Sequence, residues 1–201
     1  MKAALVVVLL YAAGSVAANG AIIGSPANGR NALPFSCAGD PDPGCVGLER
    51  YQQIHDASLF AGPITVVGLN FFLDPLGAGN ISSGVFTFSL STTLTSVAGL
   101  DKVNLDDNVG SDVELFATVN LSGGPAPDIL SFDGGLFDYD PSQGNLHISF
   151  ANASHSGPLA FYQSLRGGPI ARGFGQPGSD QQLFGTQGLV VLHTTRLGND
   201  I

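Results

Sequence analysis

The chain has no tryptophan, two cysteines, and only seven lysine and arginine residues among 201, against sixteen aspartates and glutamates. The formal net charge is -9. This shortage of cations excludes nucleic acid as a partner, because a phosphate backbone is bound by clustered Lys and Arg. Anionic membrane surfaces are disfavoured for the same reason. The absence of tryptophan leaves tyrosine as the aromatic side chain suited to stacking on a sugar while keeping a polar tip.

Long apolar runs are also missing, except at the N-terminus. There Lys2 precedes an apolar stretch from Ala3 to Ala13, and small residues near Ala17 suit signal peptidase. We therefore predict a signal peptide over residues 1–18 and a mature protein that is secreted to the periplasm or the medium. Later apolar runs are too short to span a bilayer, so no stable membrane span is expected after leader cleavage.

The two cysteines lie close together, as Cys37 and Cys45, around a loop rich in Pro, Gly and Asp. In an oxidising compartment such a pair predicts a disulfide bond. The alternative is a metal or redox pair, but the C-x-x-C spacing is absent and no histidine is nearby. Residues 19–47, which contain the pair, are expected to be mostly loop.

The remaining composition indicates many short strands joined by turns. The chain has 28 glycines and 12 prolines, only 11% of its residues are charged, and no stretch keeps helical periodicity. Strands are predicted at Ile64–Leu73, Val85–Ser91, Val113–Leu121 and Leu189–Thr195. We expect residues 19–201 to form one all-β domain, an antiparallel β-sandwich of jelly-roll type, with a barrel as the runner-up.

Two of these strands alternate apolar and polar residues, which predicts that each has one buried and one solvated face. In the first, the apolar face holds Phe86, Phe88 and Leu90. In the second, the residues expected to point inward are Val113, Leu115, Ala117, Val119 and Leu121.

A turn signal lies between two further strands, Phe132–Tyr139 and Asn145–Phe150. The connecting sequence from Asp140 to Gly144 contains Pro141, which presets φ, and a glycine that permits a positive one. The pair is predicted to form a β-hairpin.

Several sequence patterns resemble chemical sites, and each has an ordinary structural interpretation. The acidic segment Asp101–Asp112 has oxygen ligands suited to Ca²⁺, but it fails the EF-hand spacing, and a loop capped by Asp and Asn turns is favoured. Asp138 and Asp140 are expected to share a face, as paired carboxylates in glycosidases do, yet Asp before Pro is common at turns.

The sequence from Gly173 to Gly178 spells G-x-G-x-x-G, but Pro177 lies inside it and no helix signal follows, so a glycine-rich loop is favoured. The four histidines show no metal-ligand spacing. His147 is expected on the outward face of its strand, in solvent. No catalytic, cofactor-binding or metal-binding residue is assigned, and no cofactor is predicted.

Five blocks carry a family resemblance, in this order after the leader: RYQQIHDASLF, GPITVVGLNFF, SGVFTFSLSTT, LDDNVGSDVELFATVNLSG and FDYDPSQGNL. Together they resemble the PEP-CTERM surface proteins of Gram-negative bacteria. The resemblance implies a β-sandwich ectodomain exported by bacteria that make exopolysaccharide. Members end in a Pro-Glu-Pro motif, an apolar helix and a basic tail, whereas residues 193–201 carry none of these. Surface anchoring is therefore in doubt, and release or a truncated C-terminus remain alternatives.

These observations predict a non-enzymatic, exported cell-surface or extracellular matrix protein, associated with exopolysaccharide or biofilm. The alternative is a glycan binder similar to a carbohydrate-binding module. In that case Tyr51, Tyr139 and Tyr162 are the candidates for stacking on a sugar.

Overall fold

A computed structural model describes residues 21–22, 29–31, 35, 50–73, 79–101, 104–156, 162–165, 170–175, 187–188 and 190–195. The predicted signal peptide and the cysteines Cys37 and Cys45 lie outside these residues, so the leader and the disulfide stay predictions. The elements are β1 (Ala21–Ile22), β2 (Gly29–Asn31), β3 (Arg50–His55), η1 (Ala57–Leu59), β4 (Ile64–Phe72), β5 (Asn80–Thr93), η2 (Val97–Gly99), η3 (Leu105–Asn108), β6 (Glu114–Pro125), β7 (Ile129–Tyr139), β8 (Asn145–Ser156), β9 (Tyr162–Leu165), β10 (Ile170–Gly175), β11 (Gln187–Gly188) and β12 (Val190–Thr195).

The described residues form an all-β fold in which every strand pairing is antiparallel. A four-stranded sheet has the order β1-β12-β4-β7, and a five-stranded sheet has the order β10-β3-β8-β5-β6. A third, small sheet has the order β11-β9-β2. The only helices in the described part of the chain are three short 3-10 turns, η1 to η3. The predicted fold class is therefore confirmed at the level of an antiparallel all-β protein.

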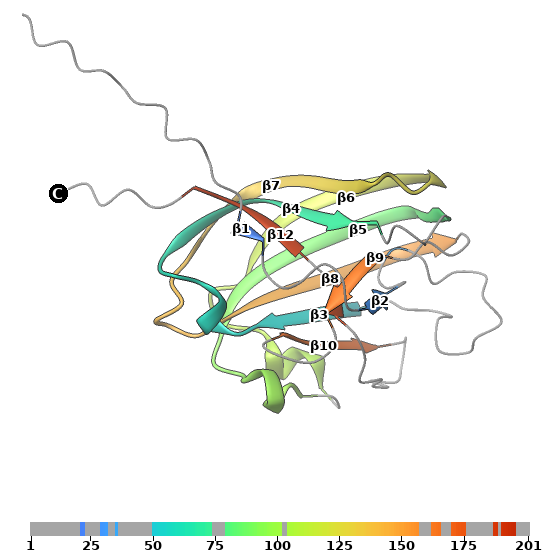
Figure 1. The fold of residues 1–201 in the computed structure, drawn as a ribbon. Helices are drawn as coiled ribbons and strands as arrows, with labels where there is room; N and C mark the ends of the chain where they lie inside the picture. The colour runs from blue at the N-terminus through green and yellow to red at the C-terminus, as the bar shows by residue number, and fades with distance from the viewer. Residues whose placement is uncertain are drawn as a thin grey trace, which may run out of the picture.

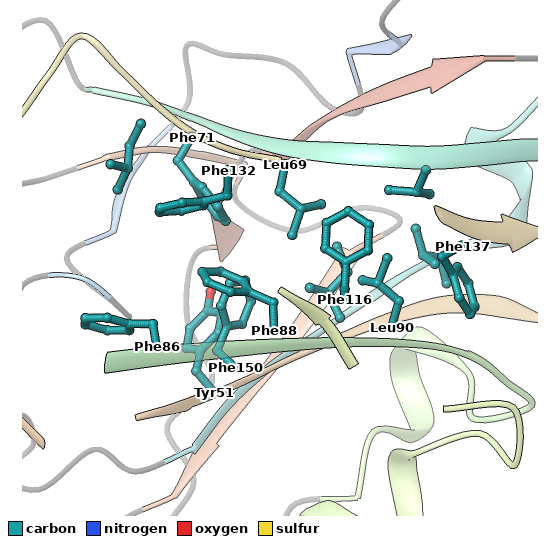
Figure 2. Close-up of a cluster of buried hydrophobic side chains, with 14 of the residues drawn as sticks. Tyr51, Leu69, Phe71, Phe86, Phe88, Leu90, Phe116, Phe132, Phe137 and Phe150 are labelled. Carbon is teal, nitrogen blue, oxygen red and sulfur yellow. The ribbon is translucent and has the colours of Figure 1, made fainter. Parts of the chain in front are cut away.

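The two larger sheets face each other across an aromatic core (Figures 1 and 2). Phe132 of β7 lies against Phe88 of β5, with ring centroids 4.9 Å apart, and Phe71 of β4 lies 5.8 Å from Phe150 of β8. Phe35 contributes a further fully buried ring to this cluster. Aromatic pairs at these distances add specific packing energy to the burial of apolar area.

The alternation in β5 is confirmed. Phe86, Phe88 and Leu90 are all fully buried in the core between the sheets, while Thr87 and Ser89 are partly exposed on the other face. The strand is longer than predicted, because it continues from Asn80 to Thr93. The start of β4 is buried on both faces, as its β-branched residues indicate.

The predicted inward face of β6 is wrong at its start. Val113 and Leu115 are exposed, and Phe116, which the alternation places outside, is buried. The cause is a β-bulge: Phe88 pairs with Ala117 while the next residue, Ser89, pairs with Leu115, so Phe116 is an extra residue in β6. An extra residue reverses the alternation on one side of the bulge.

The predicted hairpin is also wrong, although its turn exists. Gln143 N–H donates to Asp140 O at 3.0 Å, and Gly144 has φ +152°. The flanking strands do not pair with each other, because β7 pairs with β4, whereas β8 pairs with β3 and β5. The turn thus carries the chain from one large sheet to the other. Both strands have an apolar face, and this arrangement sets the two faces opposite each other in the core.

Candidate functional site

The strongest concentration of polar side chains lies on the outer face of the five-stranded sheet, beneath the connection from β5 to β6. We call residues 94–101 and 104–113 of this connection the cap (Figure 1, below β3 and β10). Leu100 and Leu105 of the cap are buried, and a Cβ added at Gly173 of β10 would lie 3.0 and 3.1 Å from their Cδ2 atoms. The glycine therefore gives the cap room to pack directly on the sheet.

Gln52 of β3 and Asn108 of η3 tie the cap to the sheet, and both are fully buried. Gln52 Nε2 donates to the carbonyl oxygen of Leu105 at 2.9 Å, and Asn108 Nδ2 donates to Gln52 Oε1 at 3.1 Å. Asn108 also holds the cap together, because its Oδ1 accepts from Asp101 N–H at 2.6 Å. Buried amides satisfied in this way stabilise one arrangement of the chain.

Ser91 of β5 and His147 of β8 form the centre of this polar layer. Ser91 Oγ lies 3.1 Å from His147 Nδ1 and accepts from Gly110 N–H of the cap at 3.0 Å. Ser91 and His147 share one hydrogen bond, whose direction depends on the tautomer of the ring. Within the described residues, Nε2 has no hydrogen-bond partner.

A serine beside a histidine is the arrangement of a nucleophile and its base. Here both side chains are fully buried under the cap, so in this arrangement a substrate has no access to Ser91 Oγ. Burial, followed by the positive charge of Arg50, lowers the pKa of His147 to about 4. The ring is therefore neutral at neutral pH, and the pair acts as an internal hydrogen bond that fastens the cap.

His147 corrects the sequence-based expectation of a solvated histidine. Its strand face was predicted correctly, since His147 pairs with Ser91 and Ile54 on the outer face, but the cap covers that face. The signal in the sequence was the length of the β5–β6 connection together with Leu100 and Leu105, because a long connection that contains leucines buries them against something.

A second polar row lies on the inner face of β3. Gln53 Nε2 donates to Tyr51 Oη at 3.0 Å, and Gln53 Oε1 lies 3.1 Å from His55 Nε2. The amide oxygen accepts, so the His55 proton is on Nε2, and Nδ1 has no hydrogen-bond partner among the described residues. Burial, followed by the nearby His147, lowers the pKa of His55 to about 3. The His55 ring is therefore uncharged at neutral pH, and the row has a structural role.

The carboxylates of the acidic segment are used in turns and a surface ion pair. Asp101 Oδ1 accepts from Asn104 N–H at 2.7 Å, Asp112 Oδ1 accepts from Thr92 N–H at 2.7 Å, and Asp106 pairs with Arg50 at 2.7 Å. This is the loop capped by Asp and Asn turns that the sequence favoured. The described residues contain no group of three or more His, Cys, Asp or Glu side chains placed to hold a metal ion.

Asp138 and Asp140 do not form a catalytic pair. Asp138 accepts from Thr65 Oγ1 at 2.7 Å, and Asp140 lies beyond the strand, where it accepts from Ser142 N–H at 2.9 Å. The hydrogen bonds from Ser142 lower the pKa of Asp140. A glycosidase acid needs a raised pKa, so the shift of Asp140 is in the wrong direction for that role.

The prediction that three tyrosines could stack on a sugar is wrong for two of them. Tyr51 is 1% exposed and Tyr139 is 0% exposed, and Tyr139 donates to Gly144 O at 2.8 Å. Both rings belong to the core and cannot stack on a glycan. Tyr162 lies in β9, but its side chain is outside the described part of the structure.

The glycine motif starts in a strand. Gly173 and Gly175 belong to β10, while residues 176–178 lie outside the described residues. A phosphate-binding turn follows its strand and opens a helix, so glycines inside a strand do not provide the same set of N–H donors. The expectation of a loop is therefore corrected for Gly173 and Gly175, which lie in a strand, and Gly173 gives the cap room to pack.

Comparisons with known proteins add no identification. The chain matches no protein-family model, no curated protein and no solved structure. In the part of the chain that the structure describes, no helix has the length and apolar character needed to cross a membrane.

Proposed function

We propose that the protein is an exported, non-enzymatic component of the bacterial cell surface or extracellular matrix, with a β-sandwich of jelly-roll type that associates with exopolysaccharide. The main supporting observation is how the reactive side chains are used. Ser91, His147 and His55 are fully buried and fasten the cap and the sheet, which is the use expected of a stable scaffold.

The exposed part of the outer sheet face supports association with a polysaccharide. Beyond the cap, the cross-strand neighbours Thr87 and Thr118 lie beside Asn120, and Thr118 and Asn120 are exposed. These side chains are uncharged and can both donate and accept hydrogen bonds, as sugar hydroxyls do. Neighbouring strands are about 4.8 Å apart, so their side chains form regular rows of such groups.

Export is tested by expressing a C-terminally tagged chain in a Gram-negative host that secretes exopolysaccharide. We expect the protein in the periplasm, the medium or the matrix, with an intact mass that lacks the first 17 or 18 residues. A cytoplasmic product that retains Met1 would contradict export.

The polysaccharide association is tested by comparing the same host with a strain that makes no exopolysaccharide. We expect retention in the matrix of the first and release from the second. The double variant Thr118→Ala/Asn120→Ala should be retained less. Ser142→Ala, in the exposed turn between β7 and β8, is the control and should be retained as well as the unmodified protein. Equal retention with and without polysaccharide would overturn this part of the proposal and leave export intact.

A further inference from the structure

The two large sheets approach each other along one side of the molecule, where β6 and β7 lie side by side (Figure 1). In the described residues each of these strands is the last in its sheet. Both are irregular at the point of approach. Phe116 is the extra residue in β6, and in β7 the pairing with β4 shifts between Phe137 and Asp133.

We call the line along which β6 and β7 lie side by side the seam. Phe116 closes it. Its ring occupies the space over Gly134 of β7, where an added Cβ would overlap the ring atoms. A Cβ added at Gly135 would lie 3.6 Å from the backbone oxygen of Phe116. Figure 2 shows Phe116 between Leu90 and Leu69, at the level of the core. The bulge therefore turns an aromatic ring inward to fill the gap between the sheets.

The same geometry turns two leucines outward. Leu115, directly before Phe116, is 67% exposed, and Leu136, directly after Gly135, is 72% exposed. Leu115 and Leu136 directly flank Phe116 and Gly135, the two residues whose backbones approach each other across the seam, so the leucines lie on either side of it. Apolar groups gathered on a surface, with polar groups around them, are typical of interaction sites.

The charged residues nearest to these leucines in the sequence are acidic. Glu114 directly precedes Leu115, Asp133 directly precedes Gly134, and both side chains are exposed. The sequence has no Lys or Arg between Lys102 and Arg166, a stretch that contains all of β6 and β7. Arg50, on β3, is engaged by Asp106.

We propose that the seam is a docking site for a segment of another protein that carries lysine or arginine beside apolar residues. Apolar side chains of the segment cover Leu115 and Leu136, and its cations lie against Glu114 and Asp133. Charge complementarity identifies this partner, because a second copy of the chain brings more negative charge to the same place. A purely cationic segment leaves the leucines uncovered.

The test measures the binding of fluorescent peptides to the purified chain by anisotropy. The alternating peptide KLKLKLK is the probe, and KSKSKSK and ELELELE separate charge from apolar contact. We expect KLKLKLK to bind at least tenfold more tightly than either of the others. Leu115→Ser/Leu136→Ser should weaken its binding at least tenfold, and Glu114→Gln/Asp133→Asn should weaken it mainly at low salt.

Leu94→Ser is the matched control, since Leu94 is 89% exposed and belongs to neither strand of the seam, and its binding should equal that of the unmodified chain. Melting temperatures should show that all variants are folded. Equal binding of KLKLKLK and KSKSKSK, or binding that the leucine variant does not change, would overturn the proposal. Concentration-dependent self-association that the leucine variant removes would overturn it in favour of a second copy.

Discussion

The two faces of the five-stranded sheet are both buried over part of their area, but they are buried by different means. The inner face is covered by the opposite sheet, whose Phe132 and Phe71 lie against Phe88 and Phe150. The outer face is covered by the cap, through two leucines and a layer of amide, hydroxyl and imidazole groups. Burial by apolar contact depends on area, whereas burial of polar groups also requires that each finds a partner. The inner face should therefore dominate stability, and each face also holds one buried histidine, His55 inside and His147 outside, that makes stability depend on pH.

The largest effect is expected from Phe88→Asp on the inner face. Phe88 is fully buried, with ring centroids 4.9 Å from both Phe132 and Phe150. The substitution removes a core ring, which alone costs about 3–5 kcal/mol, and adds a buried charge. We expect an unfolded protein, measured by circular dichroism.

Ser89→Asp is the matched control, one residue along the strand on the partly exposed face. Its free energy of unfolding should change by no more than about 1 kcal/mol. Comparable losses of melting temperature in the two variants would mean that the register of β5 is wrong.

A smaller loss is expected from Leu105→Ala in the cap. Leu105 is 1% exposed and lies against Gly173, so its truncation should reduce the free energy of unfolding by about 2–4 kcal/mol. Leu115→Ala, at a leucine that is 67% exposed, should change it by less than about 1 kcal/mol. The measurement is urea unfolding of both variants. Equal midpoints would contradict the packing of the cap on the sheet.

The inner face of β5 was predictable from the sequence, and the covering of the outer face by the cap was not. Alternation in β5 identified Phe86, Phe88 and Leu90, because the period of a strand is a local property. The burial of His147 depends on the cap. The cap is held by contacts such as that of Asn108 with Gln52, which are 56 residues apart in the sequence. No local pattern contains such a contact.

The errors in β6 and in the predicted hairpin have a similar origin. Phe116 is an extra residue only relative to its partner strand, so the bulge exists in the pairing and not in either sequence alone. The turn at Asp140–Gly144 was recognised from Pro141 and the glycine, but turn residues do not determine whether the strands they join enter one sheet or two.

Acidification should destabilise both faces, because each holds a buried histidine. Burial lowers the pKa of His147 to about 4 and of His55 to about 3, from an ordinary value of 6.5. The unfolded chain therefore binds protons first as the pH falls below 6.5, and stability present above that pH is lost progressively toward pH 4 and pH 3. Each histidine contributes a slope of at most about 1.4 kcal/mol per pH unit.

The measurement is the melting temperature at pH 7.0, 5.5 and 4.5, which should fall at each step. His147→Asn keeps a hydrogen-bond acceptor for Ser91 but does not titrate, so its melting temperature should fall less steeply. A melting temperature that is constant from pH 7.0 to 4.5 would contradict the burial of both rings. The lowered pKa values of Asp56 and Asp140 add a loss only at still lower pH.

The smallest effect is expected at the rim of the cap, where Arg50 and Asp106 form an ion pair at 2.7 Å. The Asp106 side chain is 73% exposed and that of Arg50 is 35% exposed, so water and salt screen the attraction. Asp106→Asn should reduce the free energy of unfolding by no more than about 1 kcal/mol, and less in 1 M salt. Asp107→Asn, at the next exposed carboxylate of the same 3-10 turn, is the control, and the difference between the two variants isolates the pair. A loss from Asp106→Asn as large as that from Leu105→Ala would mean that the cap is held from its charged rim, and not by the leucines and buried amides beneath it.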